Sequence, residues 1–192
     1  IVGMQSNNGG WGAFDKDNTS YYLNNIPFAD HGALLDPPTA DVSARCVSML
    51  SQIDKNSYKN TIKKGIEFLK NEQEEEGSWF GRWGANYIYG TWSVLHALKA
   101  AGENMDANYI KKAISWIKSK QNKDGGWGED CATYWKEKKN MPSIESMPSQ
   151  TSWALLSLLT LEKINESSIE RGVEFLKKNF NKKNLWKDEH FN

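Results

Sequence analysis

Two kinds of apolar pattern alternate along the chain. In the first kind, apolar residues recur at helical spacing on one side, and lysine or glutamate fills the other side. These amphipathic segments cover residues 58–69, 110–117 and 169–180. In the second kind nearly every position is apolar: "VSARCVSML" at 42–50, "TWSVLHALKAA" at 91–101 and "TSWALLSLLTL" at 151–161. The alternation predicts outer helices that face solvent and inner helices that are buried.

A glutamine, a glycine and a tryptophan recur between these segments with fixed spacing. The glycine lies four residues and the tryptophan six residues after the glutamine, in the copies Gln5–Gly9–Trp11, Gln73–Gly77–Trp79 and Gln121–Gly125–Trp127. A degraded copy keeps Trp186 but has Phe180 for the glutamine and Asn184 for the glycine. A repeated unit of inner helix, outer helix and turn predicts an all-α fold, part of an α/α toroid. Nothing in the pattern supports a β-rich or Rossmann fold.

We interpret the repeated turn as a staple between neighbouring helical hairpins. Glycine allows a sharp reversal with positive φ. The glutamine amide can hydrogen-bond a backbone group at a neighbouring helix end, and the tryptophan ring can cover that bond and exclude water. The acidic residues that trail the turns, including Asp15 and Asp17, then read as caps or surface groups.

Composition narrows the classes of function. Lysine plus arginine equals aspartate plus glutamate, at 24 each, so nothing indicates binding to nucleic acid. The nine tryptophans are more than a core of this size usually needs, which indicates a special role for some of them. Cys46 and Cys131 show no metal-binding spacing and are predicted to be reduced, buried thiols. No apolar run approaches the length that a membrane-spanning helix needs, and no signal peptide is evident.

The turns and several longer motifs resemble the triterpene cyclases, and squalene–hopene cyclases in particular. The most specific is "GSWFGRWGANYIYGTW" at 77–92, joined by "MQSNNGGWGAFDKDNTS", "IPFADHG", "DPPTADV", "DGGWGEDC" and "PSQTSWALL". The resemblance runs nearly end to end and implies that residues 1–192 are one segment of the catalytic toroid domain, truncated at both ends. It also implies squalene or a related polyprene as substrate, cyclised through carbocations to a hopanoid without metal or cofactor.

The resemblance also assigns candidate site residues. Asp41, Arg82 and Tyr89 match a hydrogen-bonded network around the catalytic acid, in which an arginine–aspartate pair would hold the region rigid. Phe14, Trp83 and Tyr89 match positions that line the cavity, and Phe28 matches the constriction at its entrance. Aromatic rings suit this role because they stabilise a cation without reacting with it.

The catalytic acid of the resembled family is absent from this sequence. It is the middle residue of an Asp-x-Asp-Asp motif, whereas the nearest string here, residues 15–18, reads Asp-Lys-Asp-Asn and aligns with a different family segment. We therefore expect the acid to lie upstream of Ile1 and the isolated segment to be inactive.

Three residues depart from the family pattern. Arg45 stands where a histidine commonly pairs with the acid, and an arginine brings a permanent charge. Phe14 replaces a more usual tyrosine, and His31 occupies a position that is often aromatic and apolar. These departures leave open a different polyprenyl substrate or product.

Alternatives from other classes stay open at this point. A toroid glycoside hydrolase would use Glu129 and Asp130, although adjacent carboxylates seldom flank one substrate. A prenyltransferase subunit would need a zinc site, for which the cysteines and histidines show no motif. The segment could also be a scaffold without activity. By analogy we expect a peripheral position on the cytoplasmic side of the membrane, and the sequence leaves open a homodimer of the full-length protein.

Overall fold

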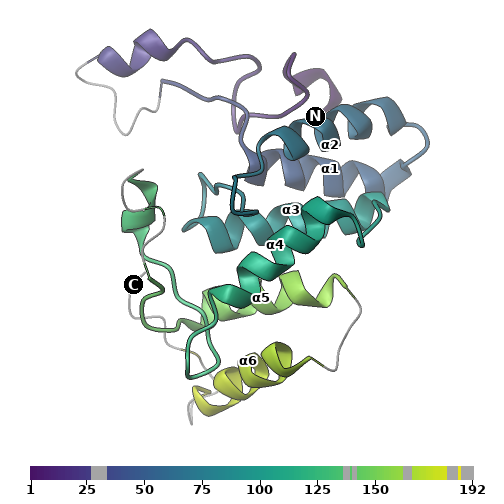
Figure 1. The fold of residues 1–192 in the computed structure, drawn as a ribbon. Coiled ribbons are helices and arrows are strands. Elements are labelled where there is room, and N and C mark those ends of the chain that lie inside the picture. The colour runs from purple at the N-terminus through teal and green to yellow at the C-terminus, as the bar shows by residue number, and fades with distance from the viewer. Residues whose placement is uncertain (27–33, 136–138, 140–141, 162–165, 181–185, 187–192) are drawn as a thin grey trace.

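Six α-helices form the body of the chain in the computed structural model, which describes residues 1–26, 34–135, 139, 142–161, 166–180 and 186 (Figure 1). The inner helices are α1 (Ala40–Asp54), α3 (Tyr87–Ala101) and α5 (Pro148–Leu159), and the outer helices are α2 (Lys59–Asn71), α4 (Asn108–Ser119) and α6 (Ser167–Lys178). Short 3-10 turns lie at Val2–Met4, Tyr21–Asn25 and Cys131–Tyr134. Within these residues the only β pairing is an isolated bridge between Asn18 and Asp36. The predicted alternation of helices is confirmed.

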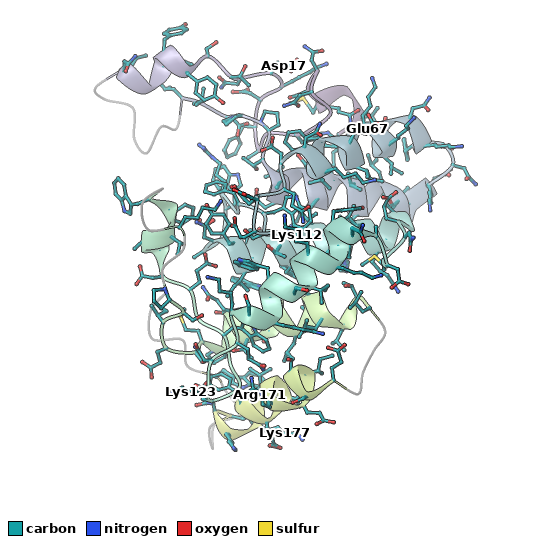
Figure 2. The ribbon with its side chains drawn as sticks, in the orientation of Figure 1. Asp17, Glu67, Lys112, Lys123, Arg171 and Lys177 are labelled. Carbon is teal, nitrogen blue, oxygen red and sulfur yellow. The ribbon has the colours of Figure 1, made fainter. Side chains whose placement is uncertain are left out.

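The helices stack as successive hairpins, from α1 and α2 at one end to α5 and α6 at the other (Figure 1). The inner helix α3 packs between α1 and α5, and each outer helix packs on an inner one. Most of the buried apolar residues form one continuous core. Charged side chains such as Glu67, Lys112 and Lys177 lie exposed on the outer helices (Figure 2). The arrangement is an arc of an α/α toroid.

The three glutamines make the same pair of hydrogen bonds. In each, Nε2 donates at 2.8 Å to the carbonyl of the glycine four residues on. The same nitrogen donates to a carbonyl in the first turn of the next outer helix, at 2.8–3.0 Å: Thr61 on α2, Tyr109 on α4 and Ser168 on α6. These are the glutamine hydrogen bonds that the staple interpretation expects, since one amide ties its own turn to the following hairpin.

The tryptophans of the turns are buried and bonded in a repeating way. Trp11, Trp79 and Trp127 are at most 2 % exposed. Each indole Nε1 donates to the carbonyl ten residues earlier in the chain, at 2.6–3.0 Å. Each backbone N–H donates to a hydroxyl in the next inner helix, from Ser43, Thr91 or Thr151. This hydroxyl contact, which the repeat alone did not reveal, ties each turn to the inner layer as well as the outer one.

The degraded fourth copy keeps part of the staple. The Nε1 of Trp186 donates to the carbonyl of Leu176, again ten residues earlier, at 2.9 Å. Its ring is 50 % exposed, unlike the buried rings of the complete copies. The hydrogen bond therefore persists without the burial.

Acidic residues after the first turn have structural partners. Both carboxylate oxygens of Asp17 accept from Asn7, one from the backbone N–H at 2.8 Å and one from the side-chain amide at 3.0 Å. Asp15 accepts from the Asn18 side chain at 3.1 Å. Both residues are exposed, which agrees with the interpretation of Asp15 and Asp17 as surface groups.

Candidate functional site

A groove of about 310 Å³ lies beside the start of α1 and α3 and collects four of the predicted site residues. They are Asp41, Arg45, Trp83 and Tyr89, and the rest of the lining is Ile1, Val42, Cys46 and Met49. Residues from two different repeats thus meet at one surface. Phe28 and His31 lie outside the described residues.

Asp41 is the carboxylate among the residues that line this groove, and it is only 1 % exposed. One oxygen accepts from the Thr39 hydroxyl at 2.6 Å and from the Val42 N–H at 3.0 Å. The other accepts from the backbone N–H of Trp83 at 2.8 Å. Asp41 therefore fixes the loop that carries Trp83 to the start of α1.

Arg82 does not form the ion pair with Asp41 that the resemblance implied. Its Nη2 donates to the Leu35 carbonyl at 3.1 Å, and its guanidinium carbon lies 5.7 Å from the centre of the Trp83 ring. Among the described residues, Arg82 makes no ion pair with Asp41. Its charge acts at longer range on Asp36, a carboxylate that the sequence did not single out.

Asp36 is 4 % exposed and accepts three backbone N–H groups from the first turn. The donors are Ala13 at 3.0 Å, Phe14 at 2.6 Å and Asp15 at 2.7 Å. Burial opposes ionisation, but these bonds and the charge of Arg82 together hold the pKa of Asp36 below its ordinary value. The carboxylate thus fixes the backbone beneath Phe14.

We expect the stability contributed by Asp36 to depend on acid pH. Because its folded pKa is lowered, the contribution is fully present above the ordinary aspartate pKa and is lost as the pH falls through the folded pKa. Urea unfolding of wild type and Asp36→Asn between about pH 6 and pH 2 measures this. The difference between the two proteins should shrink toward acid pH. A constant difference would show that the shape of the side chain, not its charge, matters.

Aromatic rings extend from the groove across the inner helices. Tyr89 lies 5.1 Å from Trp153 and 5.9 Å from Trp92 between ring centres, and Trp92 and Trp153 are stacked at 6.1 Å. On the other side, Phe14 meets Trp83 edge to face at 5.7 Å. Phe14 is 72 % and Trp83 49 % exposed, whereas Tyr89 is 9 % exposed. Trp92 and Trp153 were not singled out from the sequence, although helical spacing places Trp92 three residues after Tyr89.

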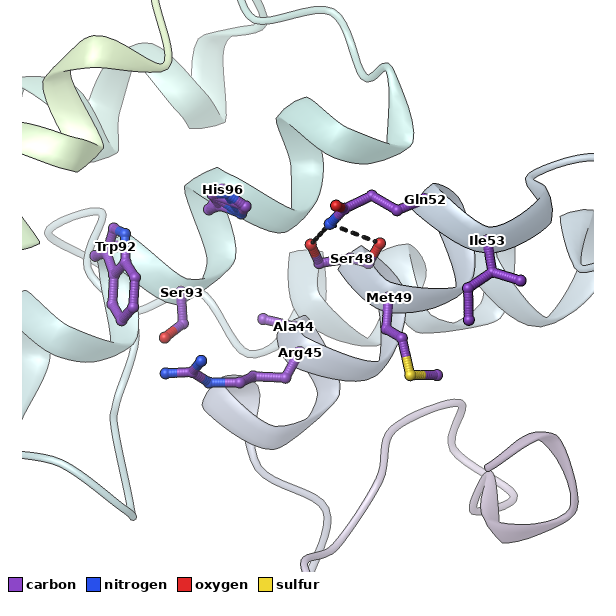
Figure 3. Close-up of a pocket in the computed structure, with 9 residues that line it drawn as sticks. All are labelled: Ala44, Arg45, Ser48, Met49, Gln52, Ile53, Trp92, Ser93 and His96. Carbon is purple, nitrogen blue, oxygen red and sulfur yellow. Dashed lines mark hydrogen bonds between the residues drawn. The ribbon is translucent and has the colours of Figure 1, made fainter.

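Arg45 joins this aromatic group. Its guanidinium carbon lies 5.2 Å from the Trp92 ring centre and 5.8 Å from that of Tyr89, and Nη2 donates to the Tyr89 hydroxyl at 3.4 Å. Figure 3 shows the Arg45 side chain extending from α1 toward Trp92 and Ser93 on α3, across a second groove of about 390 Å³. The permanent charge of Arg45 is therefore held against ring faces.

The two cysteines lie in different environments, although both were predicted to be buried. Cys46 is partly buried in the groove wall, and burial raises the pKa of its thiol to about 11. At neutral pH Cys46 is therefore protonated and a poor nucleophile. Cys131 is exposed, so the prediction of two buried thiols is wrong for this residue. It begins a 3-10 turn at the surface, where the chain has left the core.

Glu129 and Asp130 serve as caps. Glu129 is 8 % exposed and accepts backbone N–H groups at the start of α3, and burial raises its pKa against the effect of those bonds. Asp130 caps the turn Cys131–Tyr134 by accepting from the Ala132 N–H at 2.6 Å. The cavity that both residues line measures only about 20 Å³, too small for a sugar ring.

The described residues also lack two features that other classes of protein carry. No helix there has the length and apolarity needed to cross a membrane. No group of three or more histidine, cysteine, aspartate or glutamate side chains gathers there in a way that would hold a metal ion.

The stacked α/α hairpins place the chain among the α/α-toroid proteins, and its groove is lined by the rings of Trp83 and Tyr89. The chain belongs to the squalene–hopene cyclase family, because residues 1–192 match the family's C-terminal domain. It is 57 % identical over 192 residues to a squalene–hopene cyclase of Schizosaccharomyces japonicus, covering 100 % of this chain and 29 % of that protein. It is 52 % identical over 190 residues to that of Zymomonas mobilis, covering 99 % of this chain and 29 % of that protein.

A solved structure agrees with this fold. The type II terpene cyclase MstE of Scytonema has a TM-score of 0.65 to this chain at 18 % identity, over 97 % of this chain and 48 % of that one. The family assignment leaves the glycoside hydrolase and zinc prenyltransferase alternatives without support. The chain spans about 29 % of the length of the curated relatives named above.

Proposed function

We propose that the full-length protein containing this chain protonates squalene and cyclises it to a hopanoid through a series of carbocations. The observation that carries the proposal is the groove in which Trp83 and Tyr89 lie beside Asp41 and Arg45. The two relatives described above, which match 99–100 % of this chain at 52–57 % identity, are named squalene–hopene cyclases.

The chemistry of the groove suits a carbocation. A cation on the substrate needs negative potential from a surface that does not attack it, and the faces of Trp83 and Tyr89 supply this. The carboxylate of Asp41 is occupied by three hydrogen bonds and is almost fully buried, so it is poorly placed to capture a cation. The thiol of Cys46 is protonated at neutral pH.

The proton donor is proposed to come from sequence that this chain does not span. The chain has no Asp-x-Asp-Asp motif, and Asp15 and Asp17 are engaged in turn contacts. In this proposal Asp41, Arg82 and Arg45 support the site, and Phe14, Phe28, Trp83 and Tyr89 line it. The isolated segment is then a folded part of the catalytic domain without activity of its own.

Arg45, Phe14 and His31 depart from the family pattern, so the proposal includes another polyprene as an alternative substrate to squalene. Squalene partitions into membranes, so we propose a peripheral position of the full-length protein on the cytoplasmic face. A homodimer of the full-length protein is compatible with this position.

The test is incubation of the full-length protein with squalene, and in parallel with a shorter polyprenol, followed by gas chromatography–mass spectrometry. Hopene or hopanol from the wild type is expected. Trp83→Leu removes a ring face and should lower pentacyclic product roughly tenfold, with partly cyclised products appearing, as loss of a cation–π contact predicts. Trp135→Leu, at an exposed ring outside the groove, is the matched control and should retain product.

Product from the polyprenol alone would show a cyclase of another substrate. Turnover by residues 1–192 without the rest of the protein would contradict the proposed location of the acid. If no protein formed a cyclised product from either substrate, the proposed cyclase activity would be contradicted.

A further inference from the structure

Residues 129–134, which we call the rim segment, form hydrogen bonds with the loop that carries Trp83 and with the start of the helix that carries Tyr89. The rim segment follows the third Gln–Gly–Trp turn, whereas residues 81–88 follow the second. Its contacts come from Glu129, Thr133 and Tyr134 and cross about one full repeat of sequence. The third repeat thereby holds part of the second.

Glu129 caps α3 from another part of the chain. Its Oε1 accepts from the Tyr87 N–H at 3.0 Å, and its Oε2 accepts from the N–H groups of Ile88 at 2.8 Å and Asn86 at 3.4 Å. The first N–H groups of a helix have no partner within the helix, and a carboxylate also interacts favourably with the positive end of the helix dipole. One buried side chain thus satisfies the start of α3.

The capping residue of α3 itself does not perform this task. The side chain of Asn86 makes no capping hydrogen bond to α3. Its Oδ1 accepts from the Gly81 N–H at 3.2 Å, and its Nδ2 donates to the Thr133 hydroxyl at 3.3 Å. Because Asn86 is used to brace the loop, the cap of α3 depends on Glu129.

Tyr134 holds the same loop from a second point. Its hydroxyl lies 2.8 Å from the Gly81 carbonyl and 3.0 Å from the Gly84 carbonyl. Gly84 lies directly against Tyr89, since a Cβ built there would come within 2.8 Å of the ring. The rim segment therefore reaches Tyr89 by two routes, through the backbone of Gly84 and through the first turn of α3.

Tyr89 is sensitive to the placement of that turn. It is the third residue of α3, directly after Ile88, whose N–H Glu129 accepts. Its hydroxyl lies at a long 3.4 Å from Arg45, and its ring contacts Trp153. A small rotation or shift of the helix start would lengthen the Arg45 contact and turn the ring face in the groove.

We propose that Glu129 is a positioning residue for the cyclisation, acting through the cap of α3 to fix Tyr89 in the groove. This inference rests on the proposed function. Glu129 has no place in the groove lining itself, so its effect on the reaction is indirect.

The test uses the full-length protein and the isosteric substitution Glu129→Gln. The amide keeps one acceptor oxygen but sets an NH₂ group against a backbone N–H, so part of the cap is lost with little change in volume. We expect faster hydrogen exchange in peptides covering residues 86–90. We also expect kcat for squalene to fall about tenfold with KM within about twofold, because misplacement of a catalytic wall by a fraction of an ångström acts on the transition state.

A double-mutant cycle separates positioning from loss of stability. If Glu129 acts by placing the Tyr89 hydroxyl, Glu129→Gln combined with Tyr89→Phe should be no slower than the slower single variant. The matched control is Asp54→Asn, which alters another carboxylate that accepts two backbone N–H groups, at the far end of α1. Asp54→Asn should leave exchange at residues 86–90 and kcat unchanged.

Several outcomes would overturn the inference. Unchanged exchange at residues 86–90 would mean that Glu129 does not hold α3. Faster exchange with unchanged kcat and products would mean that the cap of α3 does not affect the reaction. If the losses in kcat of the two single variants multiply in the double variant, Glu129 does not act through Tyr89. A wild type that leaves squalene unchanged would instead overturn the proposed function, and the positioning role with it, while exchange would still report the cap.

Discussion

Replacing Trp79 by alanine is expected to destabilise the chain by about 3–5 kcal/mol, the range for removing a fully buried large aromatic side chain. Trp79 is 0 % exposed. Its Nε1 donates to Leu69 at 2.6 Å, and its backbone N–H donates to the Thr91 hydroxyl at 3.0 Å. The ring thus fills the space between an outer and an inner helix, and its removal leaves a cavity and an unpaired carbonyl.

Trp186→Ala is the matched control for this prediction. Trp186 makes the same bond to the carbonyl ten residues earlier but is 50 % exposed, so its loss should destabilise by only about 1 kcal/mol. Urea unfolding of the two variants beside the wild type gives the comparison. Equal losses would show that the indole hydrogen bond, and not the burial of the ring, stabilises the staple.

Gly77→Ala is expected to destabilise the chain by about 2–4 kcal/mol, from two sources. The backbone at Gly77 has φ of +107°, which a residue with a Cβ adopts only under strain. A Cβ there would also lie 2.9 Å from the carbonyl carbon and oxygen of Lys112 on α4, and backbone atoms within a helix cannot easily move aside. The alanine would force the turn away from the next outer helix and strain the Gln73 bond to Tyr109.

Gly102→Ala separates the two sources. Gly102 ends α3 with φ of +73°, but a Cβ there would meet only the end of the flexible Lys55 side chain. We expect this variant to lose roughly 1–2 kcal/mol from strain alone. Thermal unfolding of both variants measures the difference, which reports the close approach of turn and helix. If the two variants lose the same stability, the turn is not held tightly against α4.

The repeat made the fold and the staple predictable. Identical spacing of Gln73, Gly77 and Trp79 in three copies indicated one local geometry used three times, and the structure has it in each copy. The alternating patterns likewise indicated which helices lie inside, because solvent tolerates the lysine-rich faces and the core does not. These are properties of short segments and of their period.

The hydrogen-bond partners within the candidate site could not be predicted from the sequence in the same way. Asp41, Arg45, Trp83 and Tyr89 were singled out by resemblance, and the structure brings them to one groove. Their hydrogen-bond partners were not foreseen. A buried carboxylate can be satisfied by a cation or by backbone N–H groups, and only the packing decides which of them comes within reach.

Glu129 shows this limit most clearly. From the sequence it was half of an acidic pair and a candidate for catalysis in another class of enzyme. In the fold it lies against the start of α3, more than 40 residues away in the chain, where three N–H groups point at it.

The sequence by itself determined the helices, their inner and outer faces, the repeated turn and the family, since each follows from local period or from motifs. Tertiary structure alone decided which carboxylates cap which backbone groups and how Tyr89 is held. The reason is that hydrogen bonds between distant segments depend on distances of a few tenths of an ångström, which the stacking of whole hairpins sets.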